Sequence, residues 1–203
     1  MMGHFLRKTS RALRGIMVMT ALATSAAGLV SCIDDADSLY AGYHAFFRYT
    51  HSVTTPPLNA ALGNPGTFCT IDFPGKGYRF RLIGGSSQEY NYTPSAADNY
   101  GTPEFIAGFI VGTPAYPDMS GLTVPMAFDL VCPNCFEQTS IQRSLSAKST
   151  TEMQCNRCSR VYDLNNGGIV TSSTEQNPGG RALFRYRMTY SQSAGGGTLI
   201  IQN

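Results

Sequence analysis

Two pairs of cysteines constrain what this chain can fold into more than any other feature of its sequence. The first CxxC pair is Cys132 and Cys135, the second is Cys155 and Cys158, and 19 residues separate the pairs. Thiolates are soft ligands, and four of them in two pairs can surround Zn²⁺ or iron tetrahedrally. The two-residue spacer lets the chain turn so that both sulfurs of a pair face one ion, while backbone N–H groups behind the turn face the sulfurs. We therefore predict a metal site at these four cysteines.

The first 31 residues have the pattern of an export signal. Four basic residues between Arg7 and Arg14, with no acidic residue, precede the apolar run GIMVMTALATSAAGLV, which is too short to span a bilayer as a helix. The run ends in LVSC, which resembles the lipobox of bacterial lipoproteins. This resemblance implies that residues 1–31 are removed and that Cys32, acylated by fatty acids such as palmitate, becomes the mature N-terminus. An ordinary secretory signal, or a signal anchor with a chance cysteine, is the alternative.

An acylated Cys32 anchors a protein to a membrane without a spanning helix, because the buried acyl chains supply the binding energy. We therefore expect a lipid-anchored protein of the cell envelope, in the outer membrane of a Gram-negative bacterium. The acidic tract CIDDADS begins at Cys32 and resembles tags that carry some outer-membrane lipoproteins to the cell surface. A solvated tether explains the same tract equally well.

The charge of the chain argues against nucleic-acid binding. Removal of residues 1–31 takes away four of the 15 basic residues and none of the 13 acidic ones, and so changes the formal net charge from +2 to −2. No cluster of Lys and Arg then remains to neutralise phosphates, so we expect no nucleic-acid partner. The sequence indicates the membrane as a partner. It does not identify a protein or glycan partner.

After the signal, apolar and aromatic residues fall in short runs with a period near two, bounded by Gly, Pro or Asn, and a period of 3.6 is nowhere sustained. This pattern predicts an all-β fold of many short strands. The predicted strands are 45–52, 68–73, 78–83, 105–112, 125–131, 160–164, 169–172, 183–190 and 198–202. The polar stretch 84–104 is predicted to be a long loop.

Three regions follow from these patterns. Residues 1–31 are predicted to be the signal peptide and residues 32–40 the acylated N-terminus and tether. Residues 41–203 are predicted to form one β domain, in which residues 131–163 supply the metal-binding loops.

A series of short motifs follows the second cysteine pair. CNRCSRVYDLNNGGIVT is followed by GGRALFRYRMTY and by a Gly-rich turn into TLIIQ. This order resembles the second half of Rieske iron–sulfur domains. The positions that match the family's ligands, aromatic and acidic residues, turn and final hairpin are Cys155, Cys158, Tyr162, Asp163, Gly167, Gly168, Leu183 and Tyr186. The resemblance runs from Pro125 to the C-terminus. It implies Rieske-like antiparallel sheets with a small two-loop, zinc-ribbon-like metal-binding subdomain.

The ligand set departs from that family. Rieske clusters use two Cys and two His, and the His ligands raise the reduction potential. Here the first pair is CxxC where the family has a Cys, one residue and a His, and Cys158 stands where the family has its second His. His44 and His51, the histidines that follow the signal, lie far upstream. A Rieske potential therefore does not transfer to this chain.

Three metal contents remain open: one Zn²⁺, one iron, or a four-Cys [2Fe–2S] cluster. Zn²⁺ is the expected one, because a chain exported unfolded acquires an ion more easily than a cluster. The segment FLRKTSRALRG also lacks the adjacent Arg pair of the twin-arginine route, which exports folded proteins. Tyr162 and Ser159 are expected in the layer of residues behind the ligands.

Two other uses of the cysteines compete with a metal. Oxidising compartments favour disulfides, although a bridge within one CxxC closes a short loop and stabilises little. The second competing use, after structural disulfides, is that of a thiol–disulfide oxidoreductase. Its nucleophilic cysteine normally opens a helix, where the dipole lowers the pKa, whereas both pairs here adjoin predicted strands.

We expect no catalytic activity. A tetrahedral site with four protein ligands has no open position for water and serves folding, so we expect a structural metal and a binding role. An envelope electron carrier with a [2Fe–2S] cluster on the same four Cys is the alternative. No Ser/His/Asp arrangement, phosphate loop or paired carboxylate motif stands out.

A few further residues carry weaker expectations. Cys69 is expected to be a small buried hydrophobe, and His44 a packed or hydrogen-bonded core residue. The loop tyrosines Tyr90, Tyr92 and Tyr100 are expected to fold back over the sheet, with a sugar or partner surface as the alternative.

Overall fold

The computed structural model describes residues 39–203 except 86–88, 99, 119, 177 and 193–195. The predicted signal, the acylated Cys32 and most of the tether therefore lie outside the described residues. Within the described part of the chain, no helix is long and apolar enough to cross a membrane.

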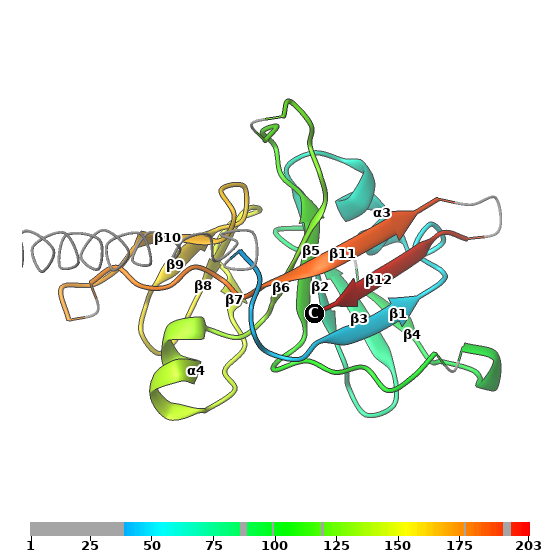
Figure 1. Ribbon diagram of the computed structural model, residues 1–203, viewed down its shortest axis with the longest axis horizontal. Coiled ribbons are helices and arrows are strands. Elements are labelled where there is room, and N and C mark those ends of the chain that lie inside the picture. Colours follow the sequence, from blue (N-terminus) through cyan, green and yellow to red (C-terminus); the bar gives the residue numbers. More distant parts are fainter. Residues whose placement is uncertain (1–38, 86–88, 99, 119, 177, 193–195) are drawn as a thin grey trace, which may run out of the picture. The chain divides into compact units, whose positions relative to one another are not determined.

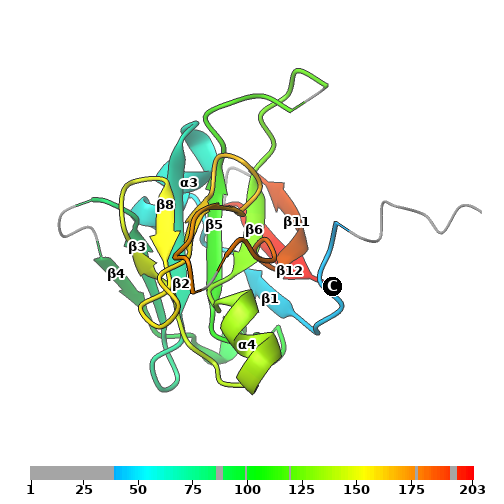
Figure 2. The same cartoon turned by 90° about the vertical axis from the view of Figure 1, so that its left-hand side faces the viewer.

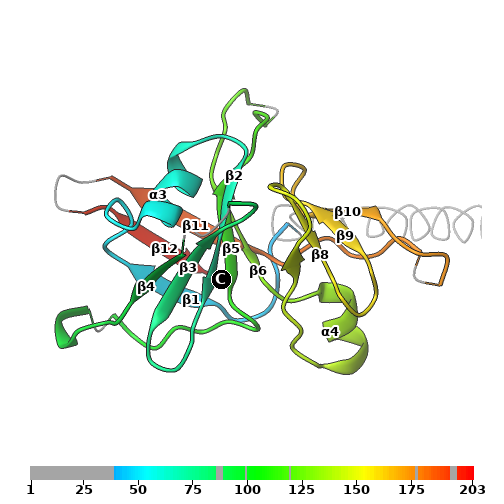
Figure 3. The same cartoon turned by 180° about the vertical axis from the view of Figure 1, so that it is seen from behind.

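An antiparallel sheet of eight strands forms the larger part of the structure (Figures 1 and 3), in the order β1-β12-β11-β6-β5-β2-β3-β4. Its strands are β1 (Phe46–Tyr49), β2 (Thr67–Asp72), β3 (Tyr78–Leu82), β4 (Glu89–Tyr92), β5 (Phe109–Thr113), β6 (Met126–Asp129), β11 (Arg185–Ser191) and β12 (Thr198–Gln202). The sheet curls strongly enough to bring its two edges together. Tyr49 on edge strand β1 packs against Tyr92 on edge strand β4, with ring centroids 5.2 Å apart.

A second antiparallel sheet has four shorter strands, in the order β10-β9-β8-β7. They are β7 (Ser146–Ala147), β8 (Glu152–Gln154), β9 (Val161–Asp163) and β10 (Ile169–Ser172). Together with helix α4 (Pro133–Thr139), these strands make up residues 131–183, which we call the cysteine lobe. In Figure 2 the lobe lies in front of the large sheet.

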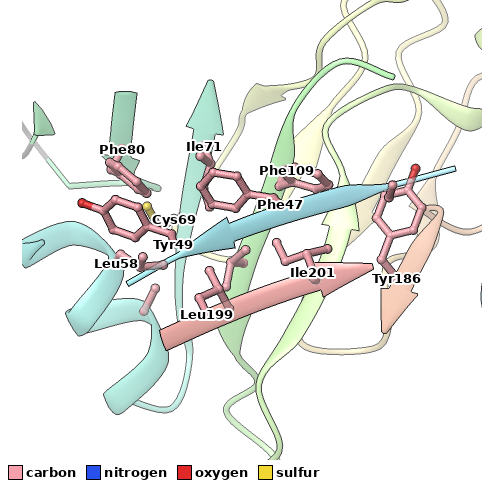
Figure 4. Close-up of a cluster of buried hydrophobic side chains, with 14 of the residues drawn as sticks. Phe47, Tyr49, Leu58, Cys69, Ile71, Phe80, Phe109, Tyr186, Leu199 and Ile201 are labelled. Carbon is pink, nitrogen blue, oxygen red and sulfur yellow. The ribbon is translucent and has the colours of Figure 1, made fainter. Parts of the chain in front are cut away.

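Side chains alternate across the large sheet and separate two buried clusters. On β5, Phe109 and Val111 face the interior of the curl, and Ile110 faces the cysteine lobe. All five residues of β5 are buried, as expected for a strand that is covered on both faces. Figure 4 shows the cluster inside the curl, which we call the sheet core. Its largest fully buried side chains are Phe47, Tyr49, Leu58, Ile71, Phe80, Phe109, Phe184 and Tyr186.

The mostly β fold agrees with the predicted class, and every predicted strand overlaps an observed one. The structure also contains two short helices that the sequence pattern did not predict. Helix α3 (Pro56–Gly63) buries Leu58, Ala61 and Leu62 at helical spacing, but eight residues are too few for a sustained period. Each of α3 and α4 begins at a proline, which fits the first turn of a helix because no backbone N–H is needed there.

The stretch 84–104 is not one long loop. It contains β4, which pairs with β3, and a 3₁₀ turn, Ala96–Asp98. The Tyr92 hydroxyl donates to Asp98 Oδ2 at 2.6 Å and so joins the strand to the turn. Tyr90 and Tyr92 pack against the sheet core, and the Tyr100 ring lies 4.5 Å from the Arg48 guanidinium carbon.

Candidate metal centre

Two short segments bring the four cysteines together. Cys132 is the N-cap of α4 and Cys135 lies within that helix, whereas Cys155 and Cys158 lie in the turn between β8 and β9. The first pair therefore opens a helix. Our expectation that both pairs simply adjoin strands was wrong for this pair, because the turn that follows β6 continues into α4.

The four sulfur atoms all lie within 4.8 Å of one another. The hydrogen-bonded sulfur pairs are Cys132 with Cys158 and Cys135 with Cys155, each at 3.7 Å. Zinc–sulfur bonds of about 2.3 Å place the corners of a tetrahedron about 3.8 Å apart. No disulfide joins the cysteines of the described residues. All four side chains are buried, so the predicted convergence on one site is confirmed, and the donor set fits a thiophilic metal ion.

Backbone N–H groups face the sulfurs in both turns. The N–H of Cys135 points to the Cys132 sulfur, and the N–H groups of Arg157 and Cys158 point to the Cys155 sulfur. Ser159 closes the second turn with a left-handed φ of 60°, and its N–H donates to the Cys155 carbonyl at 2.9 Å. The N–H groups of Cys135, Arg157 and Cys158, which face sulfurs, stabilise thiolates, as the two-residue spacing predicts.

The electrostatics favour ionisation of one thiol ahead of the others. The neighbouring Cys132 thiol and then the backbone N–H groups lower the pKa of Cys155 to about 4. Burial raises the pKa of Cys135 to about 11. The neighbouring Cys155 and burial raise the pKa of Cys132. The thiols therefore share protons, and a bound cation would replace those protons.

Tyr162 contacts a ligand sulfur, as predicted. Its hydroxyl lies 3.2 Å from the Cys132 sulfur and accepts a hydrogen bond of 3.0 Å from Asn134 Nδ2. Because that amide nitrogen can only donate, the hydroxyl hydrogen is free to point at the sulfur. Burial and the neighbouring Cys132 raise the pKa of Tyr162, so the hydroxyl keeps the proton that it donates. Ser159, the other predicted residue, contributes its backbone, and within the described part of the chain its side chain makes no hydrogen bond to a sulfur.

A backbone segment from farther along the chain closes over the site. Asn134 Oδ1 accepts from the Arg181 N–H at 3.0 Å, and Asn134 Nδ2 donates to the Arg181 carbonyl at 3.1 Å. Arg160 Nε donates to the Gly179 carbonyl at 2.6 Å. We call Gly179–Arg181 the strap. Gly180, with φ 138°, lies so close that a Cβ there would be 2.6 Å from Asn134 Oδ1.

Sequence reasoning missed Asn134 and Arg160 as parts of this site. Asn134 stands inside the first CxxC pair and Arg160 follows the second by two residues. Proximity to the ligands was thus the available signal. Their partners in the strap lie 19 to 47 residues away along the chain, and no spacing rule connects them.

The remaining candidates lie apart from the centre. Cys69 is fully buried in the sheet core, as expected. His44 is not a core residue: its side chain is 75% exposed and contacts Glu104 at 2.5 Å, because it precedes β1 on the exposed approach to that strand. His51 lies 3.8 Å from Asp98. Among the described residues, the metal-ligand cluster that includes the cysteines contains no histidine.

Comparison with known proteins finds no protein family, no curated protein and no solved structure that matches this chain. The fold and the centre are therefore described from their own residues. The resemblance to Rieske domains stays a prediction from sequence motifs.

Proposed function

We propose that this protein is an exported, lipid-anchored envelope protein that binds one Zn²⁺ through its four clustered cysteines and uses the ion to hold its cysteine lobe folded. The convergence of four buried sulfurs within 4.8 Å of one another carries the proposal. Anchoring through Cys32, and a distant likeness of Pro125–Asn203 to Rieske domains, are part of the proposal and rest on sequence motifs alone.

The spread of the sulfurs supports a single ion over a [2Fe–2S] cluster. In a cluster each iron binds two cysteines, and sulfurs on different irons lie farther apart than sulfurs on the same iron. Here the short distances of 3.7 Å run between the two CxxC pairs, and no pair exceeds 4.8 Å. Four equivalent ligands around one ion give this pattern.

Burial supports a structural role over a catalytic one. The cysteines are 0 to 6% exposed, and four protein ligands leave no coordination position for water or a substrate. The same burial argues against a thiol–disulfide oxidoreductase. Although Cys132 opens α4, it is fully buried and its pKa is raised, whereas a nucleophilic cysteine needs exposure and a lowered pKa.

Elemental analysis of the protein extracted from membranes under reducing conditions tests the proposal. We expect one equivalent of zinc, a colourless solution, and an acylated N-terminal cysteine by mass spectrometry. A red-brown protein with acid-labile sulfide would instead indicate the electron-transfer cluster. Disulfides between the two cysteine pairs, with no bound metal, would contradict both the zinc site and the cluster.

Two single-cysteine variants provide the matched control. Cys135→Ser removes a ligand and should abolish stoichiometric zinc binding. Cys69→Ser removes a buried thiol outside the cluster and should leave one zinc per chain. Equal zinc content in the two variants would contradict the assignment of the ligands.

A further inference from the structure

Arg160 is a buried cation with no carboxylate partner in the described part of the chain. The residue is only 5% exposed, and none of the ion pairs of the described residues includes it. Its Nη1 atom is buried without a hydrogen-bond partner among those residues. Lys and Arg are almost never fully buried unless they are paired, because a buried, unpaired charge is strongly destabilising. Some anionic group must therefore compensate this guanidinium.

The groups that face the guanidinium are those of the metal centre. Its electrostatic neighbours are Cys158, Tyr162 and Cys132, with the strongest influence from Cys158. Zn²⁺ with four thiolates carries a net charge of about −2. The buried cation and the proposed metal–thiolate centre thus compensate each other, since each would be costly to bury alone.

The protein fixes the guanidinium in this position from three sides. Arg160 follows the second CxxC turn, where its carbonyl accepts from the Cys155 N–H at 3.0 Å. Its Nε is held by the Gly179 carbonyl of the strap at 2.6 Å. A Cβ on Gly180 would lie 2.8 Å from that Nε, so the strap approaches the arginine closely only because residue 180 is glycine. The strap therefore holds the Nε edge of the guanidinium, while Nη1 is buried without a partner among the described residues.

We infer that Arg160 is the counter-ion of the metal–thiolate centre: its guanidinium, positioned by the strap, faces the Cys158 sulfur and offsets the charge that four thiolates bring to a buried site. This inference rests on the proposed metal site and deepens it. Arg160 is a positioning and charge-compensating residue and not a ligand. Removing its charge weakens metal binding even when the four ligands are intact.

Zinc affinity, measured by competition with a chromophoric chelator on the full chain, tests the inference. We expect Arg160→Gln to bind Zn²⁺ about 10- to 100-fold more weakly, the range typical for residues behind metal ligands. Arg160→Lys keeps the charge and should lie closer to the wild type than Arg160→Gln does. Lys148→Gln is the matched control, because Lys148 lies in the same lobe with its exposed side chain paired with Glu152. It should stay within about twofold of the wild type, since exposed charges contribute little.

Cobalt substitution separates a role in charge from a role in packing. The ligand-field bands of Co²⁺ report tetrahedral geometry, and the thiolate-to-cobalt charge-transfer band reports the charge around the sulfurs. In Arg160→Gln we expect the charge-transfer band to move to lower energy while the ligand-field bands stay in place. Unchanged affinity and an unchanged charge-transfer band would overturn the inference, as would an Arg160→Lys variant as weak as Arg160→Gln. A wild-type protein that binds no zinc would instead refute the proposed function itself.

Discussion

The sheet core and the cysteine lobe are held together by different chemistry. In the sheet core, aromatic side chains pack in series: Phe47 lies 5.8 Å from Phe109 and Phe73 lies 4.2 Å from Phe105 between ring centroids. Such side chains bury large apolar areas and stabilise a fold without any ion. The lobe has strands of only two to four residues, and four of its buried side chains are cysteines. A region with so little apolar area to bury needs another source of stability.

The two regions also treat a buried charge differently. Asp129, in the large sheet, is fully buried, and the protein surrounds its carboxylate with donors. Backbone N–H groups of Ile106, Ala107 and Val131 donate at 2.9, 3.2 and 2.8 Å, and the Tyr186 hydroxyl donates at 3.1 Å. Arg160, in the lobe, donates one hydrogen bond to a carbonyl, and its Nη1 is buried without a partner among the described residues. The carboxylate in the sheet is thus satisfied by protein donors alone, whereas the buried arginine of the lobe has no carboxylate partner among the described residues and fits the proposed metal–thiolate centre.

Removal of the metal should reveal the difference in stability between the two regions most clearly. We expect chelation, or Cys135→Ser, to unfold residues 131–183 while the large sheet stays folded, because structural zinc contributes about 10–16 kcal/mol to folding in small zinc domains. Hydrogen exchange by mass spectrometry should find full exposure of peptides that contain β8 and β9 and continued protection of β2 and β5. Simultaneous loss of both regions, or protection of the lobe without metal, would contradict the division.

A truncated side chain in the sheet core should lower the stability of the metal-loaded chain far more than a truncated side chain in the lobe. Phe109→Ala removes a fully buried ring from the central strand β5, and we expect it to lower the free energy of unfolding by about 3–5 kcal/mol. Ile169→Ala, at a position 43% exposed in the lobe, should cost within about 0.5 kcal/mol. Denaturant titration measures both. A similar loss in the two variants would mean that the sheet core does not dominate the stability of the metal-loaded chain.

The sequence predicted the parts of the fold that depend on the local sequence pattern. The strands around Ile71, Phe109 and Ile201 were found because each is a short apolar run bounded by turn residues. Helix α4 was missed because it has only seven residues, which begin with a proline and include Cys135, and these are too few for a helical period. Strand β4 was missed because its residues are polar or half-buried at a sheet edge.

The candidate metal centre was likewise predicted only in part from the sequence. Spacing alone predicted Cys132, Cys135, Cys155 and Cys158, because a two-residue gap has a physical meaning within each turn. The strap could not be predicted, since the contact between Asn134 and Arg181 spans 47 residues and depends on how the lobe folds back. The counter-ion role of Arg160 likewise depends on burial, which a charged residue in a sequence does not indicate.

The strap offers a finer test of the lobe. In Gly180→Ala the new Cβ would meet Asn134 Oδ1 at 2.6 Å and Arg160 Nε at 2.8 Å, at a φ of 138° that alanine rarely adopts. We expect the strap to detach at a cost of about 1–3 kcal/mol, with zinc released faster to a chelator. Gly63→Ala meets nothing within 4 Å and should leave zinc release unchanged. Equal release rates in the two variants would show that the strap does not cover the centre.

The smallest expected effect lies at the edge of the large sheet, where Asp98 joins β4 to the following turn. The hydrogen bond from Tyr92, followed by those from the Ser95 hydroxyl and N–H, lowers the pKa of Asp98 to about 2. Because the unfolded chain binds this proton more readily than the folded chain, the contribution of Asp98 to stability is present above about pH 4 and is lost as the pH falls through about 2.

In Asp98→Asn this part of the acid dependence should disappear, so that the difference in unfolding midpoint between the variant and its parent narrows from pH 5 to pH 2. The measurement belongs in the Cys135→Ser background, where release of the metal cannot contribute to the titration. A difference that stays constant across this range would mean that the carboxylate is not what fastens β4. The acid sensitivity of the sheet would then have to come from another carboxylate whose pKa is lowered by folding.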